Sequence, residues 1–273
     1  MDLEAFIVNH QVSVRLSTFF GILGMMAVLE LAAPRRRLSA SKNVRWFSNL
    51  SIVFLNTFLL RLISASGAVG VAALAHREGW GLFNVVNLPL WLEALLSIVI
   101  MDCAIYLQHV MFHALPVFWR LHRVHHADLD IDVTTGARFH PIEIVVSMYI
   151  KFATILLVGA AAGAVIFFEV VLNGTAMFNH ANVYLPKRLD AVLRLFLVTP
   201  DMHRVHHSIR TDETNSNFGF NLPWWDYLFG TYTPQPAEGH DGMTIGISQH
   251  RDPKQVSRLP GMLLLPFSSQ KDG

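Results

Sequence analysis

The chain has 273 residues, of which 52% are hydrophobic and only 15% are charged. Soluble domains carry about 25% charged residues, so this composition excludes a disordered chain and argues against an ordinary soluble globular protein. The formal net charge of +1 argues against a nucleic-acid-binding protein, and the single cysteine, Cys103, excludes both an internal disulfide and a zinc or iron–sulfur site built from cysteines.

Long apolar segments dominate the first two thirds of the chain. In order, they run from Thr18 to Ala33, from Leu50 to Ala75, from Leu88 to Leu107 and from Ile144 to Leu172. A membrane-spanning helix needs about 20 mostly apolar residues, so these segments predict an all-α integral membrane protein with about four apolar helical segments. A very apolar soluble helical protein is the alternative, but four such segments rarely coincide by accident. The N-terminal sequence has no basic region, so we expect the first segment to be retained rather than cleaved as a signal peptide.

The loop after the first segment is strongly basic. It contains Arg35, Arg36, Arg37, Lys42 and Arg45. Such clusters mark the cytoplasmic side of a membrane protein. Residues 76–83 would then lie outside, and the third segment would return the chain to the cytoplasm near His109.

The fourth segment spans residues 144–172 and carries Gly159 and Gly163 beside a run of alanines near its middle. A single crossing would leave His140 and His180 on opposite sides of the membrane. We therefore expect a re-entrant or shallow helical hairpin that breaks at these glycines, with arms of about 14 residues, or roughly 21 Å. The broken backbone at its tip would need the other membrane helices to satisfy its polar groups.

Histidines are the unusual feature of the composition, because the chain has 14 where about six would be typical. Three clusters have the spacing of one helical turn. They are His109 and His113, then His122, His125 and His126, and then His203, His206 and His207. Residues three and four apart share a helix face, and each His-His doublet adds an imidazole rotated by about 100°, so a doublet can serve two neighbouring metal ions. Imidazole suits zinc, iron, copper and nickel, and this surplus of ligands indicates two metal ions.

Six histidines lie outside these three clusters. His180 follows the second arm of the hairpin and is expected to be a metal ligand. His140 precedes the first arm and is interpreted either as a ligand or as a residue that positions one. Four others stand alone in polar surroundings or near the termini, so surface positions are expected for them. These are His10, His76, His240 and His250.

The clusters resemble the pattern of the fatty acid hydroxylase/sterol desaturase superfamily of membrane-bound non-haem diiron oxygenases. That pattern is His-x(3,4)-His, then His-x-x-His-His, then a late His-x-x-His-His, and the resemblance covers about residues 90–235. The family also uses a histidine pair between the second and third boxes. His180 matches its first member, but Tyr184 stands at the second, for which His140 is a candidate substitute. The resemblance implies a membrane-embedded helical base and a cytoplasmic helical cap that carries the histidine boxes.

By the same resemblance, the protein would use two Fe ions and O2 to hydroxylate or desaturate an aliphatic lipid or sterol-like substrate that enters from the bilayer. The chain has no Gly-x-Gly-x-x-Gly fingerprint and no cysteine cluster, so electrons would come from a separate donor such as a ferredoxin or a cytochrome b5-like protein. A histidine-rich metal transporter is one alternative, but it would place its ligands within the spans rather than at their ends. A zinc metallohydrolase is another, but it would need a carboxylate base beside its ligands, and none of the three boxes contains one.

Several residues near the boxes are secondary candidates. Ligating histidines need an acceptor for their other ring nitrogen. The candidate acceptors are Asp102, Asp128, Asp201 and Asp226. Arg123 and Arg204 are interpreted as contacts to lipid headgroups or to an acidic redox partner, or as plain surface charge. Trp224 and Trp225 suit either a membrane interface or core packing.

These patterns divide the chain into three parts. Residues 1–87 are expected to form N-terminal membrane helices, and residues 88–235 a fatty acid hydroxylase-type catalytic domain. Residues 236–273 are rich in turn-forming residues, so an irregular C-terminal tail is expected.

Overall fold

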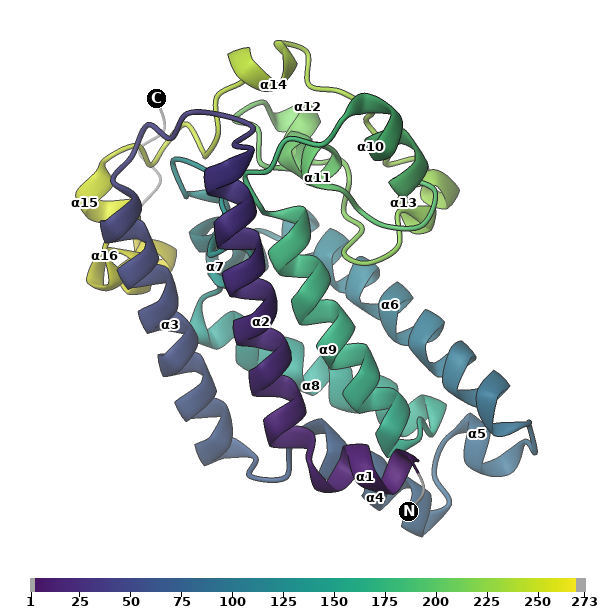
Figure 1. Ribbon diagram of the computed structural model, residues 1–273. Helices are drawn as coiled ribbons and strands as arrows, with labels where there is room; N and C mark the ends of the chain where they lie inside the picture. The colour runs from purple at the N-terminus through teal and green to yellow at the C-terminus, as the bar shows by residue number, and fades with distance from the viewer. Residues whose placement is uncertain (1–2, 269–273) are drawn as a thin grey trace.

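The computed structural model describes residues 3–268, and the regular elements in that range are helical apart from two isolated β-bridges. The helices of the bundle are α1 (Leu3–Asn9), α2 (Gln11–Ala32), α3 (Lys42–Ile63), α4 (Gly67–Glu78), α5 (Leu82–Val85), α6 (Leu90–Ala114), α8 (Pro141–Val158) and α9 (Ala162–Asn179). Shorter elements gather at one end of this bundle and form the cap (Figure 1). They are α7 (Pro116–His126), η1 (Thr135–Ala137), α10 (Lys187–Leu193), α11 (Pro200–His206), α12 (Thr211–Thr214), α13 (Trp224–Phe229), α14 (Gly239–Gly242), α15 (Pro253–Val256), α16 (Leu259–Leu264) and η2 (Leu265–Phe267).

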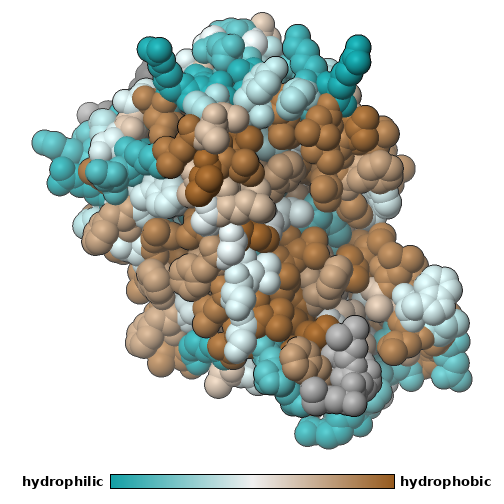
Figure 2. Space-filling model, viewed as in Figure 1, coloured by the Kyte–Doolittle hydropathy of each residue, from teal (hydrophilic) through white to brown (hydrophobic). Residues whose placement is uncertain are grey.

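The bundle has the composition of a membrane domain. Helices α2, α3, α6 and α9 run along the length of the molecule (Figure 1). These helices and α8 each lie in one of five stretches that are long and apolar enough to cross a membrane. Their outward side chains are apolar, and Leu31, Phe47 and Leu157 are 74–75% exposed. Figure 2 shows this apolar surface over the flank of the bundle, with hydrophilic residues toward its two ends. The chain is an integral membrane protein, and the predicted all-α membrane fold is confirmed.

The second apolar segment forms two helices rather than one. α3 ends at Ile63, where the backbone of Ser64 becomes extended, and α4 begins at Gly67, whose φ is +57°. The alanines Ala68 and Ala72 of α4 are buried in one apolar cluster with residues of α8 and α9. α4 therefore lies at the end of the bundle away from the cap (Figure 1).

The fourth segment folds as a helical hairpin, and the break falls at a predicted glycine. Gly159 ends α8 with a φ of +75°, a conformation that glycine adopts without a steric penalty. Gly81 approaches the same turn so closely that a Cβ on it would lie 2.3 Å from the Gly159 nitrogen. Each arm has 18 residues rather than the expected 14, because the helices continue past the apolar stretch to Pro141 and Asn179. The re-entrant depth of the hairpin in the membrane stays a prediction.

The described part of the C-terminal tail, residues 236–268, forms short helices that pack against the protein, which corrects the expectation of an irregular segment; residues 269–273 lie outside the described range. Its elements α15, α16 and η2 bury Val256, Met262 and Leu265. These side chains pack in one cluster with Val124 of α7 and Ile52 of α3. Burial of this apolar face stabilises short helices that would not form alone. The division of the chain at residues 87 and 235 stays a prediction.

The two box arginines are buried, which corrects their interpretation as lipid, partner or surface contacts. Arg123 is 1% exposed, and its Nη2 donates to the carbonyl oxygens of Leu265 at 2.5 Å and Ser268 at 2.9 Å. Arg204 is 0% exposed and forms an ion pair with Asp201, one turn earlier on α11. The C-terminal segment therefore covers Arg123, whereas the partners of Arg204, Asp201 and the Ala181 carbonyl oxygen, precede it in the chain, and neither guanidinium group faces solvent.

Candidate metal centre

The histidine boxes come together where the bundle meets the cap. His109 and His113 lie on the last two turns of α6, and the second box lies on α7, which begins at Pro116. The third box lies on α11 and the residue after it, and the Thr199 hydroxyl caps the first turn of this helix. His180 is the C-cap residue of α9. The C-terminal ends of α6, α9 and α11, together with α7, thus bring imidazoles from distant parts of the chain close together.

Nine of the predicted histidines form two adjoining groups. The first group is His109, His113, His122, His126 and His206, and the second group is His125, His180, His203 and His207. Within each group, one ring nitrogen from every histidine lies within 4.8 Å of the others. Each His-His doublet sends one imidazole to each group, as its helical geometry predicts. The groups adjoin, since the ring centroids of His126 and His207 are 4.5 Å apart.

In the first group, ring nitrogens of different histidines face one another. His109 Nε2 lies 3.1 Å from His122 Nε2 and 3.0 Å from His206 Nε2. The Nδ1 atoms of His109 and His206 donate to the carbonyl oxygens of Phe218 and Ser216, each at 2.7 Å. In a neutral ring, these bonds leave a lone pair on each Nε2. Two lone pairs that face each other cannot share a hydrogen bond, whereas a metal ion between them would bind both.

The second group shows the same close approach of ring nitrogens. His180 Nε2 lies 3.1 Å from His125 Nε2 and 3.0 Å from His203 Nε2, while its Nδ1 donates to the Ala176 carbonyl oxygen at 2.7 Å. Within the described part of the chain, both ring nitrogens of His207 are buried without a hydrogen-bond partner. Two nitrogens bound to one ion at ~2.1 Å and at right angles lie ~3.0 Å apart, so these separations fit metal ligation.

Burial keeps the rings uncharged. For five histidines outside the membrane helices, burial lowers the pKa well below the usual 6.5, and neighbouring imidazoles lower it further. These are His125, His126, His203, His206 and His207. Uncharged imidazole is the form that binds a metal. The donor set therefore fits iron, among the metals that prefer nitrogen ligands.

The acceptors that orient these rings are mostly backbone carbonyls and one glutamate that the sequence analysis missed. Glu143 is 3% exposed, and its Oε1 accepts from His122 Nδ1 at 2.6 Å. It lies 21 residues after His122, in the first turn of α8. An acidic residue is common at that helix position, so the sequence around it does not signal a role at the site.

The predicted aspartates do not accept hydrogen bonds from box histidines among the described contacts. They bond elsewhere in the cap and bundle. Asp128 accepts from Arg45 Nε at 2.6 Å; burial alone would raise the pKa of Asp128, but Arg45 and Arg138 hold it at about 2. Asp226 contacts the site only indirectly. Its Oδ1 accepts from the N–H of Phe218, and the Phe218 carbonyl oxygen accepts from His109 Nδ1. Burial raises the pKa of Asp226 to about 6.

Asp201 and Asp102 are tied in the same way to other partners. Asp201 pairs with Arg35 at 3.2 Å, and Asp102 Oδ2 accepts from Trp225 Nε1 at 2.7 Å. Trp225 thus joins α13 to α6 inside the protein, while its neighbour Trp224 is 44% exposed. These aspartates do not orient the histidines directly, because a buried carboxylate bonds to the donors that the fold brings nearest.

Of the histidines outside the clusters, some lie where the sequence predicts and others do not. His140 lies outside both groups, and its Nδ1 accepts from the Ile142 N–H at 3.2 Å, which caps α8. His240 and His250, expected at the surface, are 6% and 4% exposed because the tail packs against the cap. The other two, His10 and His76, are exposed as expected.

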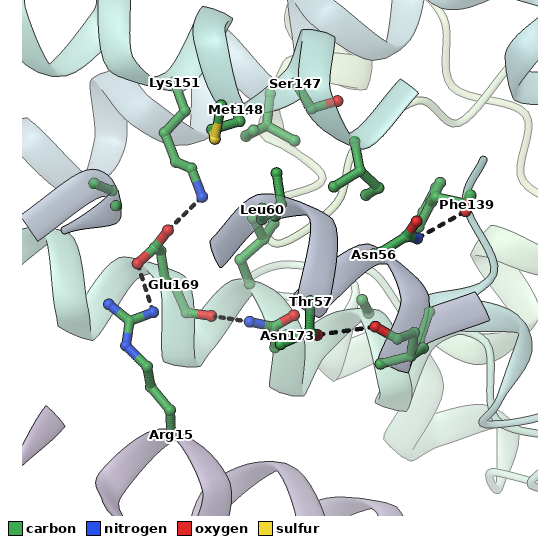
Figure 3. Close-up of a pocket in the computed structure, with 18 of the residues that line it drawn as sticks. Arg15, Asn56, Thr57, Leu60, Phe139, Ser147, Met148, Lys151, Glu169 and Asn173 are labelled. Atoms are coloured by element: carbon green, nitrogen blue, oxygen red, sulfur yellow. Dashed lines mark hydrogen bonds and ion pairs between the residues drawn. The ribbon is translucent and has the colours of Figure 1, made fainter. Parts of the chain in front are cut away.

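A cavity of about 500 Å³ adjoins the first histidine group. One end is lined by His109, His122 and Glu143, and the cavity continues between α2, α3, α8 and α9. Apolar side chains such as Leu60 and Met148 line it, with scattered polar groups among them (Figure 3). The sequence shows which segments are apolar, but the space between helices depends on how they pack.

The amino-acid sequence matches one protein family. Residues 94–231, half of the chain, match the family model described as fatty acid hydroxylase. The ornithine lipid hydroxylase OlsE of Rhizobium tropici is 25% identical over 237 residues, which cover 83% of this chain and 70% of that protein. No solved structure matches the chain significantly.

Two further relatives are matched over smaller shares of their length. Alkylglycerol monooxygenase of Xenopus tropicalis is 27% identical over 68% of this chain, but the match spans only 41% of that protein. The very-long-chain aldehyde decarbonylase CER1 of Arabidopsis thaliana is 29% identical over 46% of this chain and 21% of its own length. The matched family region contains every box histidine and His180.

Proposed function

Because the chain belongs to the fatty acid hydroxylase family, whose members are iron-dependent lipid oxygenases, we propose that it hydroxylates an aliphatic position of a membrane lipid at two iron ions. The observation that carries this proposal is the pair of adjoining histidine groups, whose facing nitrogens lie beside a largely apolar cavity. The similarity to a lipid hydroxylase and to an alkylglycerol monooxygenase supports hydroxylation rather than desaturation.

In this proposal one ion binds the group of five histidines and the other binds the group of four. Bound iron would supply the reduction of dioxygen, in which one oxygen atom enters a C–H bond and the other leaves as water with two electrons and two protons. The chain's own residues hold the donors in place. Glu143 and the carbonyls of Phe218, Ser216 and Ala176 accept from Nδ1, so the Nε2 atoms point inward.

The cavity supplies the place for the lipid. Phe112 and Phe139 line it near the first histidine group, and Leu60 and Phe152 line it farther away. Such a wall binds an aliphatic chain and excludes water from the site. The substrate would enter from the bilayer, and the electrons would come from a separate donor such as a ferredoxin or a cytochrome b5-like protein, since the sequence has no flavin or iron–sulfur motif.

The position of the basic loop supports a cytoplasmic site. Arg35 lies in the loop between α2 and α3, and its Nε is 3.2 Å from Asp201, which is two residues before His203. The basic loop is therefore at the same end of the bundle as the boxes. Basic loops stay in the cytoplasm, so the histidines would face the cytoplasm too.

Metal analysis and oxygen consumption on the purified protein test the proposal. We expect two iron ions per chain and oxygen uptake that requires both a reductant and added membrane lipid. Mass spectrometry should then find a lipid product heavier by one oxygen atom. Exchanging His125 and His206 together for alanine should abolish uptake and lower bound iron, whereas His10→Ala, at an exposed position, should change neither.

The outcomes that contradict the proposal are specific. Bound zinc without oxygen uptake would favour a metallohydrolase, and metal flux across liposomes would favour a transporter. An alkene product from the same substrate would make the protein a desaturase.

A further inference from the structure

The half of the cavity away from the histidines has an excess of positive charge. We call this part the distal half. Its lining residues come from the first two turns of α2, from the end of α3 and the start of α4, and include Lys151 and Glu169. Among the described lining residues there, three are cationic, namely Arg15, Arg61 and Lys151, and one, Glu169, is acidic. The segments that contribute them belong to the candidate membrane spans, where unmatched charge is rare and usually functional.

Glu169 lies between two of these cations (Figure 3). Arg15 Nη1 is 2.6 Å from Glu169 Oε2, and Lys151 Nζ contacts the other carboxylate oxygen. One carboxylate opposite two cations leaves one positive charge. A guanidinium has five N–H donors and an ammonium three, so the carboxylate satisfies only part of them. The Arg15 and Lys151 side chains remain 29% and 21% exposed, which leaves both accessible to a ligand.

Further donors lie in the distal half. Arg61 Nη1 donates to the Ala65 carbonyl oxygen at 3.0 Å, and its side chain carries other N–H groups. Ala68 and Val69 of the first turn of α4 also line the cavity, as does Gly67, whose own N–H donates to Ser64 Oγ at 3.2 Å. The first N–H groups of a helix have no intrahelical acceptor, and this end of the helix dipole favours a negative charge.

We infer that the distal half binds the anionic headgroup of the lipid substrate, a carboxylate or a phosphate, and that the aliphatic chain runs along the cavity to the histidines. This inference rests on the proposed function and narrows its substrate class. Lys151 lies eight residues after Glu143 on α8, and Glu143 contacts His122. That separation is ~12 Å along the helix, roughly ten methylene groups of an extended chain. The oxidised carbon therefore lies well along the chain rather than next to the headgroup.

Binding measurements that need no turnover test this assignment. The purified holoprotein in a nonionic detergent is titrated at pH 8 with hexadecyl phosphate, palmitate, hexadecanol and inorganic phosphate, and tryptophan fluorescence reports binding. We expect both anionic amphiphiles to bind about tenfold more tightly than the alcohol, because charge-assisted hydrogen bonds are the strong ones. Inorganic phosphate should bind much more weakly than hexadecyl phosphate, since it lacks the chain.

Variants of opposite sign separate charge from structure. Lys151→Gln should weaken binding of the anionic amphiphiles about tenfold and leave hexadecanol unchanged. Glu169→Gln removes the competing carboxylate, so it should strengthen anion binding. Arg61 lies outside the ion-pair cluster, so Arg61→Gln should fold even if Lys151→Gln does not. It should also weaken binding of the anionic amphiphiles and leave hexadecanol binding unchanged. The matched control is Arg77→Gln, at an exposed arginine of α4 that pairs only with Glu78 among the described ion pairs.

Several outcomes would overturn the inference. They are equal binding of hexadecanol and palmitate, phosphate binding as tight as that of hexadecyl phosphate, or weaker binding of all amphiphiles alike in Lys151→Gln and Arg61→Gln. A protein that binds anionic amphiphiles without any oxygen uptake would refute the proposed function but not this site. A protein that oxidises only uncharged lipids would refute the site but not the proposed function.

Discussion

Removal of the Glu143 carboxylate is expected to weaken metal binding at the first histidine group alone. Glu143 is 3% exposed, and its Oε1 accepts from His122 Nδ1 at 2.6 Å. A hydrogen bond to a charged group contributes about 1.5–3 kcal/mol, and water does not readily replace it at a buried site. A loss of about 1.4–2.8 kcal/mol corresponds to a ten- to hundredfold loss of affinity, the usual effect of removing an acceptor behind a metal-bound histidine.

Chelator titration of the iron-loaded protein measures this effect. In Glu143→Ala, one ion should leave at a ten- to hundredfold lower chelator concentration, while the ion at the second group leaves as in the wild type. Glu143→Gln keeps an oxygen acceptor, so its shift should be smaller. Glu213→Gln is the matched control, because Glu213 is equally buried in the cap and accepts from the Ala237 N–H. Release of both ions from Glu143→Ala at wild-type chelator concentrations would refute the reasoning.

Three further outcomes are expected. Burial raises the pKa of Asp226 to about 6, so its contribution to stability is fully present below its usual pKa of 3.8 and is lost as the pH rises through 6. Asp226→Asn should remove that pH dependence, at most about 3 kcal/mol, from unfolding measured between pH 4 and 7.5. Gly159→Ala should lower the melting temperature by an amount equivalent to about 1–2 kcal/mol, since φ is +75° there, whereas Gly21→Ala, with open space around it, should not. His140→Ala should keep both metals and lower the free energy of unfolding by about 1 kcal/mol, because the cap of α8 is lost. His180→Ala should lose the metal of the second group. Equal iron loss in these two variants would contradict the assignment.

Local patterns in the sequence were sufficient for the membrane helices and the histidine boxes. Apolar length predicts a span because lipid offers no partner for an unpaired backbone group, and Gly159 predicts the hairpin break because it can adopt a positive φ. The doublet His125–His126 predicts two directions of ligation, because adjacent residues on a helix point about 100° apart. Each of these properties belongs to residues that are close together in the chain.

Other parts of the site depend on contacts between distant residues. Glu143 meets His122, and Phe218 meets His109, across 21 and 109 residues. The sequence places four aspartates near the boxes as suitable acceptors, but the fold pairs them with other donors, such as Arg45 for Asp128. No periodicity in the sequence specifies such pairings.

The sequence determined the kind of donor and its local spacing, because helix geometry and imidazole chemistry act over a few residues. Packing of the helices decided which nitrogens face each other, which histidines stay apart, such as His140, and where space remains between helices for the cavity. It also decided that the tail covers Arg123. These features follow from how helices far apart in the chain fill volume together, and that is a property of the whole folded molecule.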